Sequence, residues 1–124
     1  MIKGIGLDLC RISRIESALK SEHFREKVFT SEEIAYAESR AAQRLDSYAA
    51  SYAAREAFVK ASGASLHTVI FGGGFALLRS ESGAPYVRLS GELSKYAERA
   101  KIHVSLTHEG DYACAMVVIE ETDN

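Results

Sequence analysis

Four polar side chains stand out because the segments that carry them are otherwise apolar or built from small residues: Asp8, Glu56, Lys60 and His108. Two carboxylates from distant segments suit Mg²⁺, which takes one or two protein carboxylates and completes its shell with waters and substrate phosphates. A lysine one helical turn after Glu56 could neutralise a phosphate oxygen, and a histidine at the end of a strand could hydrogen-bond another. The pattern indicates phosphoryl or pyrophosphate chemistry.

Each of these residues also has a structural explanation. A glutamate four residues before a lysine is a common pair on a helix surface, worth roughly 0.2–0.5 kcal/mol. Asp8 could cap the segment that follows its strand. Ser105 and His108 lack the context of a nucleophile elbow, and no cluster of Cys and His residues indicates zinc. Spacing therefore leaves a metal site and purely structural roles both open.

The segment that positions Glu56 and Lys60 reads as one helix over residues 47–63, SYAASYAAREAFVKASG. Its alanines are strong helix formers, and they make the helix thin enough for other backbone or a ligand to approach closely. Gly63 is placed for a left-handed C-cap. A helix this apolar is expected in the middle of a small domain.

Asp8 lies in residues 2–10, which alternate as a strand. Aspartate is disfavoured in strands, so this carboxylate needs hydrogen bonds, a cation or a metal. Gly4 and Gly6 remove side chains just upstream, as often happens where a ligand approaches closely. One face of the strand would carry Ile5, Leu7 and Leu9, and the other face Gly6, Asp8 and Cys10.

Two capping boxes predict the helices between these two segments. The first box, at 13–16, opens a helix that runs to about His23, and the second, at 30–33, opens one that runs to about Arg44. A short break at 45–46 leads into the alanine-rich helix. A modest basic strip lies on the outward side of the first helix and just past its end, and it consists of Arg14, Lys20 and Arg25. Such charges are usually only a solvated surface.

The second half of the chain changes character after Gly63. Gly72, Gly73 and Gly74 are too few and wrongly spaced for a phosphate-binding loop, so they predict a flexible connection or a bulge. The element order predicts the α+β class, with a mainly antiparallel sheet packed around the alanine-rich helix in a single domain over 1–124. The elements expected here are two strands, a helix and two further strands, at 75–79, 86–89, 91–100, 102–107 and 112–120.

Composition narrows the class of protein. The 124 residues are 26% charged and 47% hydrophobic, and the net charge of −2 argues against general binding to nucleic acids or anionic membranes. The N-terminus lacks the apolar region and cleavage site of a signal peptide. Cys10 and Cys114 have no metal-type spacing and read as small buried hydrophobes in a reducing compartment. We expect a cytoplasmic protein with a small-molecule or protein partner.

Four ordered motifs span the chain: GIGLDLCRISRI at the N-terminus, FTSEE at 29–33, YAAREAFVKASG at 52–63 and VSLTHEGDYACAMVV at 104–118. Together they resemble the acyl-carrier-protein synthase type of 4′-phosphopantetheinyl transferase. The resemblance implies transfer of 4′-phosphopantetheine from coenzyme A to a serine of an apo acyl carrier protein, with release of adenosine 3′,5′-bisphosphate. It also implies a homotrimer with active sites at the subunit interfaces.

The resemblance assigns roles to individual residues. Asp8 and Glu56 match the family's two magnesium ligands, and Lys60 and His108 match residues of its catalytic and coenzyme A site. Gly63 falls in the same coenzyme A motif. The basic strip matches the surface that docks the acidic carrier protein, with Arg14 at its centre and Lys20 and Arg25 beside it. Arg44 matches an arginine that reaches the coenzyme A of a neighbouring subunit.

The chain departs from the family pattern at two places. Ser51 stands where the family often has arginine, which would remove a contact to the nucleotide, whereas Arg55 keeps the charge of the family's lysine. The glycine-containing segment 64–75 is also irregular.

Three points stay open at this stage. The same metal pair would serve a hydrolase of nucleotide pyrophosphates, and the same fold could bind carrier proteins or coenzyme A without turnover. For the transferase, Glu56, a bound water or His108 could accept the proton of the carrier serine. The carrier protein and the range of acyl-coenzyme A donors are not specified.

Overall fold

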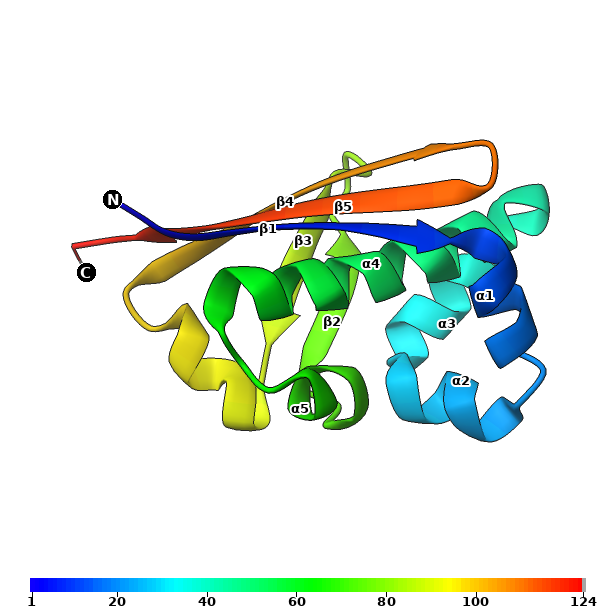
Figure 1. The fold of residues 1–124 in the computed structure, drawn as a ribbon, viewed down its shortest axis with the longest axis horizontal. Helices are drawn as coiled ribbons and strands as arrows, with labels where there is room; N and C mark the ends of the chain where they lie inside the picture. Colours follow the sequence, from blue (N-terminus) through cyan, green and yellow to red (C-terminus); the bar gives the residue numbers. More distant parts are fainter. Residues whose placement is uncertain (124) are drawn as a thin grey trace.

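The computed structural model describes residues 1–123 as a three-stranded sheet, a two-stranded sheet and a set of helices around one long helix, α4 (Figure 1). This confirms the predicted α+β class. In chain order the elements are β1 (Ile2–Arg11), α1 (Ile12–Ala18), α2 (Glu22–Val28), α3 (Ser31–Glu38), the 3₁₀ helix η1 (Ala41–Gln43), α4 (Arg44–Ser62), α5 (Leu66–Phe71), β2 (Phe75–Arg79), β3 (Pro85–Leu89), the 3₁₀ helix η2 (Gly91–Ala97), β4 (Ala100–Glu109) and β5 (Tyr112–Glu121).

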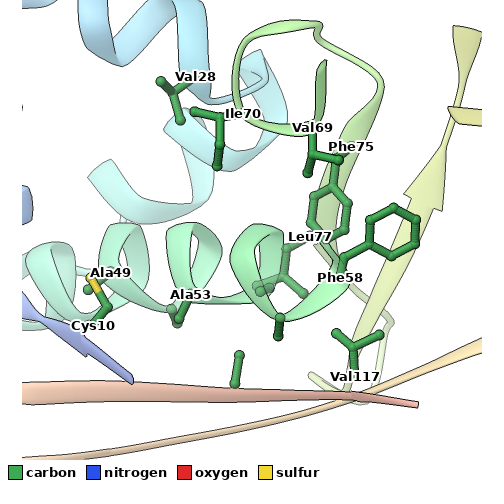
Figure 2. Close-up of a cluster of buried hydrophobic side chains, with 14 of the residues drawn as sticks. Cys10, Val28, Ala49, Ala53, Phe58, Val69, Ile70, Phe75, Leu77 and Val117 are labelled. Carbon is green, nitrogen blue, oxygen red and sulfur yellow. The ribbon is translucent and has the colours of Figure 1, made fainter. Parts of the chain in front are cut away.

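Helix α4 lies between the larger sheet and the rest of the molecule. The larger sheet has the order β1-β5-β4, and β2 and β3 form the smaller one, with every pairing antiparallel. Figure 2 shows α4 passing between Cys10 and Val117 on the sheet side and Val69 and Phe75 on the other side. Five alanines of α4 are at most 7% exposed, and only Ala61 near its end is partly buried, so the expectation of a central helix is confirmed.

The glycines of β1 are needed for this packing. A Cβ atom at Gly4 would lie 1.8 Å from the carbonyl oxygen of Ala61, and one at Gly6 would lie 1.8 Å from that of Ala57. The close approach predicted from these glycines and from the alanines of α4 therefore occurs, but the partner is helix backbone. The expectation that a ligand approaches Gly4 and Gly6 is wrong.

The two faces of β1 reverse the usual pattern. Gly6, Asp8 and Cys10 face α4 and are buried, whereas Ile5, Leu7 and Leu9 are between 58% and 63% exposed. Only small side chains fit beneath the helix, so the large apolar ones are on the outer face of the sheet. Met116 on β5 extends this apolar outer face toward the middle of the sheet.

A buried ion pair joins α3 to α4. Both terminal nitrogens of Arg55 donate to Glu33, at 2.7 and 2.6 Å, and Nη2 also donates to the carbonyl oxygen of Phe75 at 2.9 Å. Glu33 accepts further bonds from the backbone of Leu77 and of Thr30, where it completes the predicted capping box. The guanidinium also lies over the ring of Phe75, 5.2 Å from its centroid.

Helix boundaries differ from the predictions in the first half of the chain. α1 begins at Ile12, whose N–H donates to the carbonyl oxygen of Asp111, so the predicted capping box at 13–16 is wrong. The helix predicted to reach His23 is two helices, because Ser21 caps α2 by accepting from the backbone of Phe24. The break expected at 45–46 lies earlier, since α3 ends at Glu38 and α4 already begins at Arg44.

Two more segments differ after α4. Residues 64–75 contain the unpredicted helix α5, capped by the hydroxyl of Ser65, and Gly72 to Gly74 form an ordered turn that connects it to β2. The helix expected over 91–100 is a 3₁₀ helix that ends at Ala97. Gly63 is the left-handed C-cap of α4, as predicted. No helix among the described residues combines the length and apolar character of a membrane span.

Candidate active site

The carboxylates of Asp8 and Glu56 meet where β1 packs on α4. Asp8 is buried, with 8% of its surface exposed, and Glu56 is half-buried at the edge of the helix. Burial raises the pKa of Glu56, and a hydrogen bond to Asp8 and the negative charge of Asp8 add to the rise. That hydrogen bond forms only when one of the two carboxyl groups holds a proton. The pair is therefore poised to share a proton or a cation.

Lys60 lies at one end of this carboxylate pair. Its Nζ donates to the carbonyl oxygen of Leu7 at 2.8 Å and lies 3.4 Å from Oδ1 of Asp8. The lysine side chain is 57% exposed, so its ammonium can turn toward a ligand without unfolding the helix. Gly63 ends α4 three residues farther on, and a Cβ there would meet nothing within 4 Å.

The donor set fits Mg²⁺. The second oxygen of Asp8, Oδ2, is buried and accepts no hydrogen bond in the described part of the chain, although a buried carboxylate oxygen needs a partner. A cation between the two carboxylates would satisfy it. Mg²⁺ commonly takes one or two protein carboxylates and completes its shell with waters or phosphates.

Tyr52 and Arg14 stand at the end of the site opposite Lys60. Tyr52 is one turn before Glu56 on the same face of α4, and its ring is 6.3 Å from that of Phe24 on α2. Burial raises the pKa of Tyr52, and the charge of Glu56 adds to the rise, so the hydroxyl keeps its proton. The charge of Arg14, an exposed residue on α1, partly offsets both this rise and that of Glu56. Sequence reasoning missed Tyr52, although its four-residue spacing from Glu56 was the available signal.

Cys10 borders the same cluster but is unsuited to chemistry. Burial raises the pKa of its thiol to about 11, and the charges of Asp8 and Glu56 contribute to that rise. Nucleophilic cysteines need the thiolate form. The side chain is therefore part of the core, as predicted, whereas Cys114 is only partly buried.

His108 and Arg44 are placed away from the carboxylate pair. Nδ1 of His108 lies 3.6 Å from Oδ2 of Asp46, in the first turn of α4, and Arg44 is bound to Glu38 at 2.8 Å. Ten residues separate Asp46 from Glu56, which corresponds to about 15 Å along a helix. One chain brings Asp8, Glu56 and Lys60 together but does not bring His108 or Arg44 to them.

The basic strip is only partly available as a docking surface. Arg14 and Lys20 are exposed on the α1 side of the site. Arg25 is instead held between two carboxylates, 3.6 Å from Glu22 and 3.9 Å from Glu38. Arg14 and Lys20 are thus the members of the strip that are free to contact a partner's acidic groups.

Ser51, which departs from the family pattern, and Arg55, which keeps the family's charge, both face the core. Ser51 is buried on the side of α4 that carries Arg55, and its carbonyl oxygen accepts a bond from the Arg55 side chain. Five residues correspond to about 140° around a helix, so this side is turned away from Glu56. The charge at Arg55 stabilises the fold and does not line the site.

The chain was compared with known proteins. Residues 4–117 match the family model described as the 4′-phosphopantetheinyl transferase superfamily. A holo-[acyl-carrier-protein] synthase from Methylobacterium sp. (strain 4-46) is 44% identical, with 97% of this chain and 95% of that protein covered, and one from Ruminiclostridium cellulolyticum is 40% identical, with 97% and 93% covered.

Solved structures agree with the sequence matches. A holo-[acyl-carrier-protein] synthase from Neisseria meningitidis superposes with a TM-score of 0.86 at 28% identity, covering 98% of this chain and 100% of that one. The synthase from Bacillus anthracis, solved in complex with coenzyme A (3′,5′-ADP), superposes with a TM-score of 0.81 at 28% identity, covering 98% and 99%.

Proposed function

Because the chain belongs to the 4′-phosphopantetheinyl transferase superfamily, we propose that it transfers 4′-phosphopantetheine from coenzyme A to a serine of an apo acyl carrier protein. The family and the enzyme class predicted from the four motifs are confirmed. The reaction depends on Mg²⁺ and releases adenosine 3′,5′-bisphosphate, and residues 1–124 act as one transferase domain. The observation that carries the proposal is the pair formed by buried Asp8 and half-buried Glu56, with Lys60 at its exposed edge.

Each residue of this group has a separate task. Asp8 and Glu56 would hold Mg²⁺, and the bound ion would offset negative charge on the pyrophosphate of coenzyme A. Lys60 turns from the carbonyl oxygen of Leu7 to the same phosphate oxygens and stabilises the leaving group. Gly63 leaves room for the nucleotide next to the lysine.

The attacking serine must lose its proton. Glu56 or a bound water can accept this proton, since both belong beside the reacting phosphate in the proposed site. His108 can take this role only when another subunit supplies it, since its own chain holds it near Asp46.

We further propose a homotrimer with active sites between subunits. The apolar outer face of the larger sheet supports the trimer, because monomeric proteins rarely expose a contiguous apolar patch. This face is formed by Ile5, Leu7, Leu9 and Met116. A neighbouring subunit could also bring its His108 and Arg44 to the carboxylate pair.

Two measurements test the assembly. Sedimentation should give a trimer for the wild-type chain and a monomer for Leu7→Arg. Inactive Glu56→Gln and His108→Ala chains, refolded together, should recover part of the activity. A wild-type monomer with full activity would refute the shared site.

One assay tests the function itself. The protein is incubated with coenzyme A, Mg²⁺ and apo carrier protein, and the mass of the intact carrier is measured. A gain of one phosphopantetheine group is expected. Unchanged carrier and coenzyme A would instead indicate a binding module, and cleavage of coenzyme A with an unchanged carrier would indicate a pyrophosphate hydrolase. The cytoplasmic location stays a prediction.

A further inference from the structure

Lys60 contacts the same carboxylate that the proposed Mg²⁺ site needs. Its Nζ lies 3.4 Å from Oδ1 of Asp8 and donates to the carbonyl oxygen of Leu7 at 2.8 Å. An ammonium group and a divalent cation both carry positive charge, so each weakens the binding of the other beside one carboxylate. A metal ion at Asp8 therefore has to share this residue with Lys60.

The charge of Lys60 acts on both members of the carboxylate pair. Lys60 is one turn after Glu56 on α4, and side chains at this spacing lie roughly 5–6 Å apart at their Cβ atoms. Burial and Asp8 raise the pKa of Glu56, and the positive charge of Lys60 opposes that rise. The ammonium thus supplies part of the positive charge that the two carboxylates need.

This compensation is incomplete. Oδ1 is the oxygen of Asp8 beside Lys60, whereas Oδ2 is buried and accepts no hydrogen bond from residues 1–123. A divalent cation would satisfy Oδ2, but the ammonium at Oδ1 lowers its affinity for as long as it stays there. The position of Lys60 therefore controls how strongly the pair attracts a cation.

The lysine can leave this position at small cost. Its side chain is 57% exposed, and β1 is an edge strand of the larger sheet. The bond to the carbonyl oxygen of Leu7 is exposed as well, so a water molecule can replace Nζ there. The movement needs only a change of side-chain rotamer and leaves α4 intact.

The pyrophosphate of coenzyme A offers Lys60 a stronger acceptor than Leu7 does. Phosphate oxygens carry negative charge and accept short, charge-assisted hydrogen bonds, whereas a carbonyl oxygen is neutral. In the proposed reaction Lys60 turns from Leu7 to these oxygens. The same movement separates the ammonium from Asp8, which restores the full demand of the carboxylate pair for a cation.

We propose that Lys60 couples metal binding to donor binding: it weakens Mg²⁺ binding at Asp8 and Glu56 until the pyrophosphate of coenzyme A draws its ammonium away. This inference rests on the proposed function and adds to it that the ion and the donor bind tightly only together. Because such coupling is reciprocal, Mg²⁺ raises the affinity for coenzyme A by the same factor.

Replacing Lys60 by methionine tests the first half of the proposal, since it removes the charge and keeps a long, helix-forming side chain. Mn²⁺, which suits the same carboxylate ligands and loses its solution EPR signal on binding, is the probe. Without coenzyme A, Lys60→Met should bind Mn²⁺ at least about tenfold more tightly than the wild type. Lys27→Met is the matched control, because Lys27 is an exposed lysine on α2 and its loss changes the net charge equally.

Coenzyme A, at a concentration that saturates each chain, tests the second half. It should tighten Mn²⁺ binding to the wild type by a factor about tenfold larger than in Lys60→Met, after subtraction of the Mn²⁺ that coenzyme A binds alone. No carrier protein is present, so this readout does not depend on transfer.

Three results would overturn the proposal: Mn²⁺ binding in Lys60→Met that is no tighter than in the wild type, an equal gain in Lys27→Met, or the same effect of coenzyme A in both chains. Circular dichroism of both variants confirms that each is folded. A wild-type chain that shows the coupling but leaves apo carrier protein unmodified would refute the proposed function alone. Transfer without the coupling would refute only this inference.

Discussion

Lys60 forms its ion pair with Asp8 on the neighbouring strand, at 3.4 Å, and donates to the carbonyl oxygen of Leu7 at 2.8 Å. From the sequence, the lysine could equally have paired with Glu56 on its own helix. The observed arrangement fixes Lys60 across the junction of β1 and α4 and leaves the two carboxylates facing each other. Glu56 and Lys60 on α4 therefore belong to a site that α4 and β1 form together.

Replacing Glu56 by glutamine should stabilise the metal-free protein at neutral and alkaline pH. Burial and the neighbouring Asp8 raise the pKa of Glu56, so the folded protein resists its ionisation more than the unfolded chain does. Ionisation therefore costs stability as the pH rises through the ordinary pKa of glutamate toward the raised one. The variant should melt higher than the wild type in EDTA at about pH 8, and this gap should close near pH 4. A gap of the same size at both pH values would contradict the assignment.

Added Mg²⁺ should raise the melting temperature of the wild-type chain. A ligand that binds only the folded state stabilises it by about 2.7 kcal/mol at a concentration of 100 Kd. Asp8→Asn should remove the effect, because the variant loses the oxygen that lacks a partner in the fold. Equal ionic strength from NaCl serves as the control. A rise as large in Asp8→Asn as in the wild type would show that Mg²⁺ binds elsewhere.

The buried ion pair should be essential for the fold. Glu33→Gln leaves the Arg55 guanidinium charged and uncompensated in the core, and losses of this kind cost about 3–5 kcal/mol. Urea denaturation measures the loss. Glu32 is the matched control, since it binds Arg88 through two hydrogen bonds at the surface, and Glu32→Gln should change stability little. Similar losses in both variants would contradict this account.

The sequence predicted the elements whose signals are local and strong. β1, α4, the Thr30 capping box and the Gly63 cap were all identified from periodicity or cap residues. The short helices α2 and α5 were missed because seven or six residues show too little periodicity, although Ser21 and Ser65 were available as cap signals. The start of α1 depends on a bond from Ile12 to Asp111, which no local pattern contains.

The site was predictable only in part, for a related reason. Asp8, Glu56 and Lys60 were selected as polar residues in apolar elements, and the fold brings these three together. His108 has the same sequence character, but its position depends on the register of β4 with β5, which places it beside the first turn of α4. The periodicity of a strand predicts which face of the sheet a side chain is on. It does not predict which end of a neighbouring helix that side chain will contact.

Arg14 should matter for the carrier protein more than for coenzyme A. The residue is exposed beside the site, and charge reversal in Arg14→Glu should raise the KM for an acidic carrier at least about tenfold. Arg88→Glu, on β3, is the control for a general effect of net charge. The difference between the two variants should shrink at high salt, because exposed charges are screened. An unchanged carrier KM in Arg14→Glu would argue against docking on this side.

The central claim is most directly tested by the intact mass of an apo carrier protein after incubation with coenzyme A and Mg²⁺, using the wild type, Asp8→Asn and Glu56→Gln in parallel. The wild-type chain is predicted to add one phosphopantetheine group per carrier. Both variants, folded by circular dichroism, should transfer it at least about 10²-fold more slowly. An unmodified carrier with the wild type, or wild-type rates in either variant, would contradict the account.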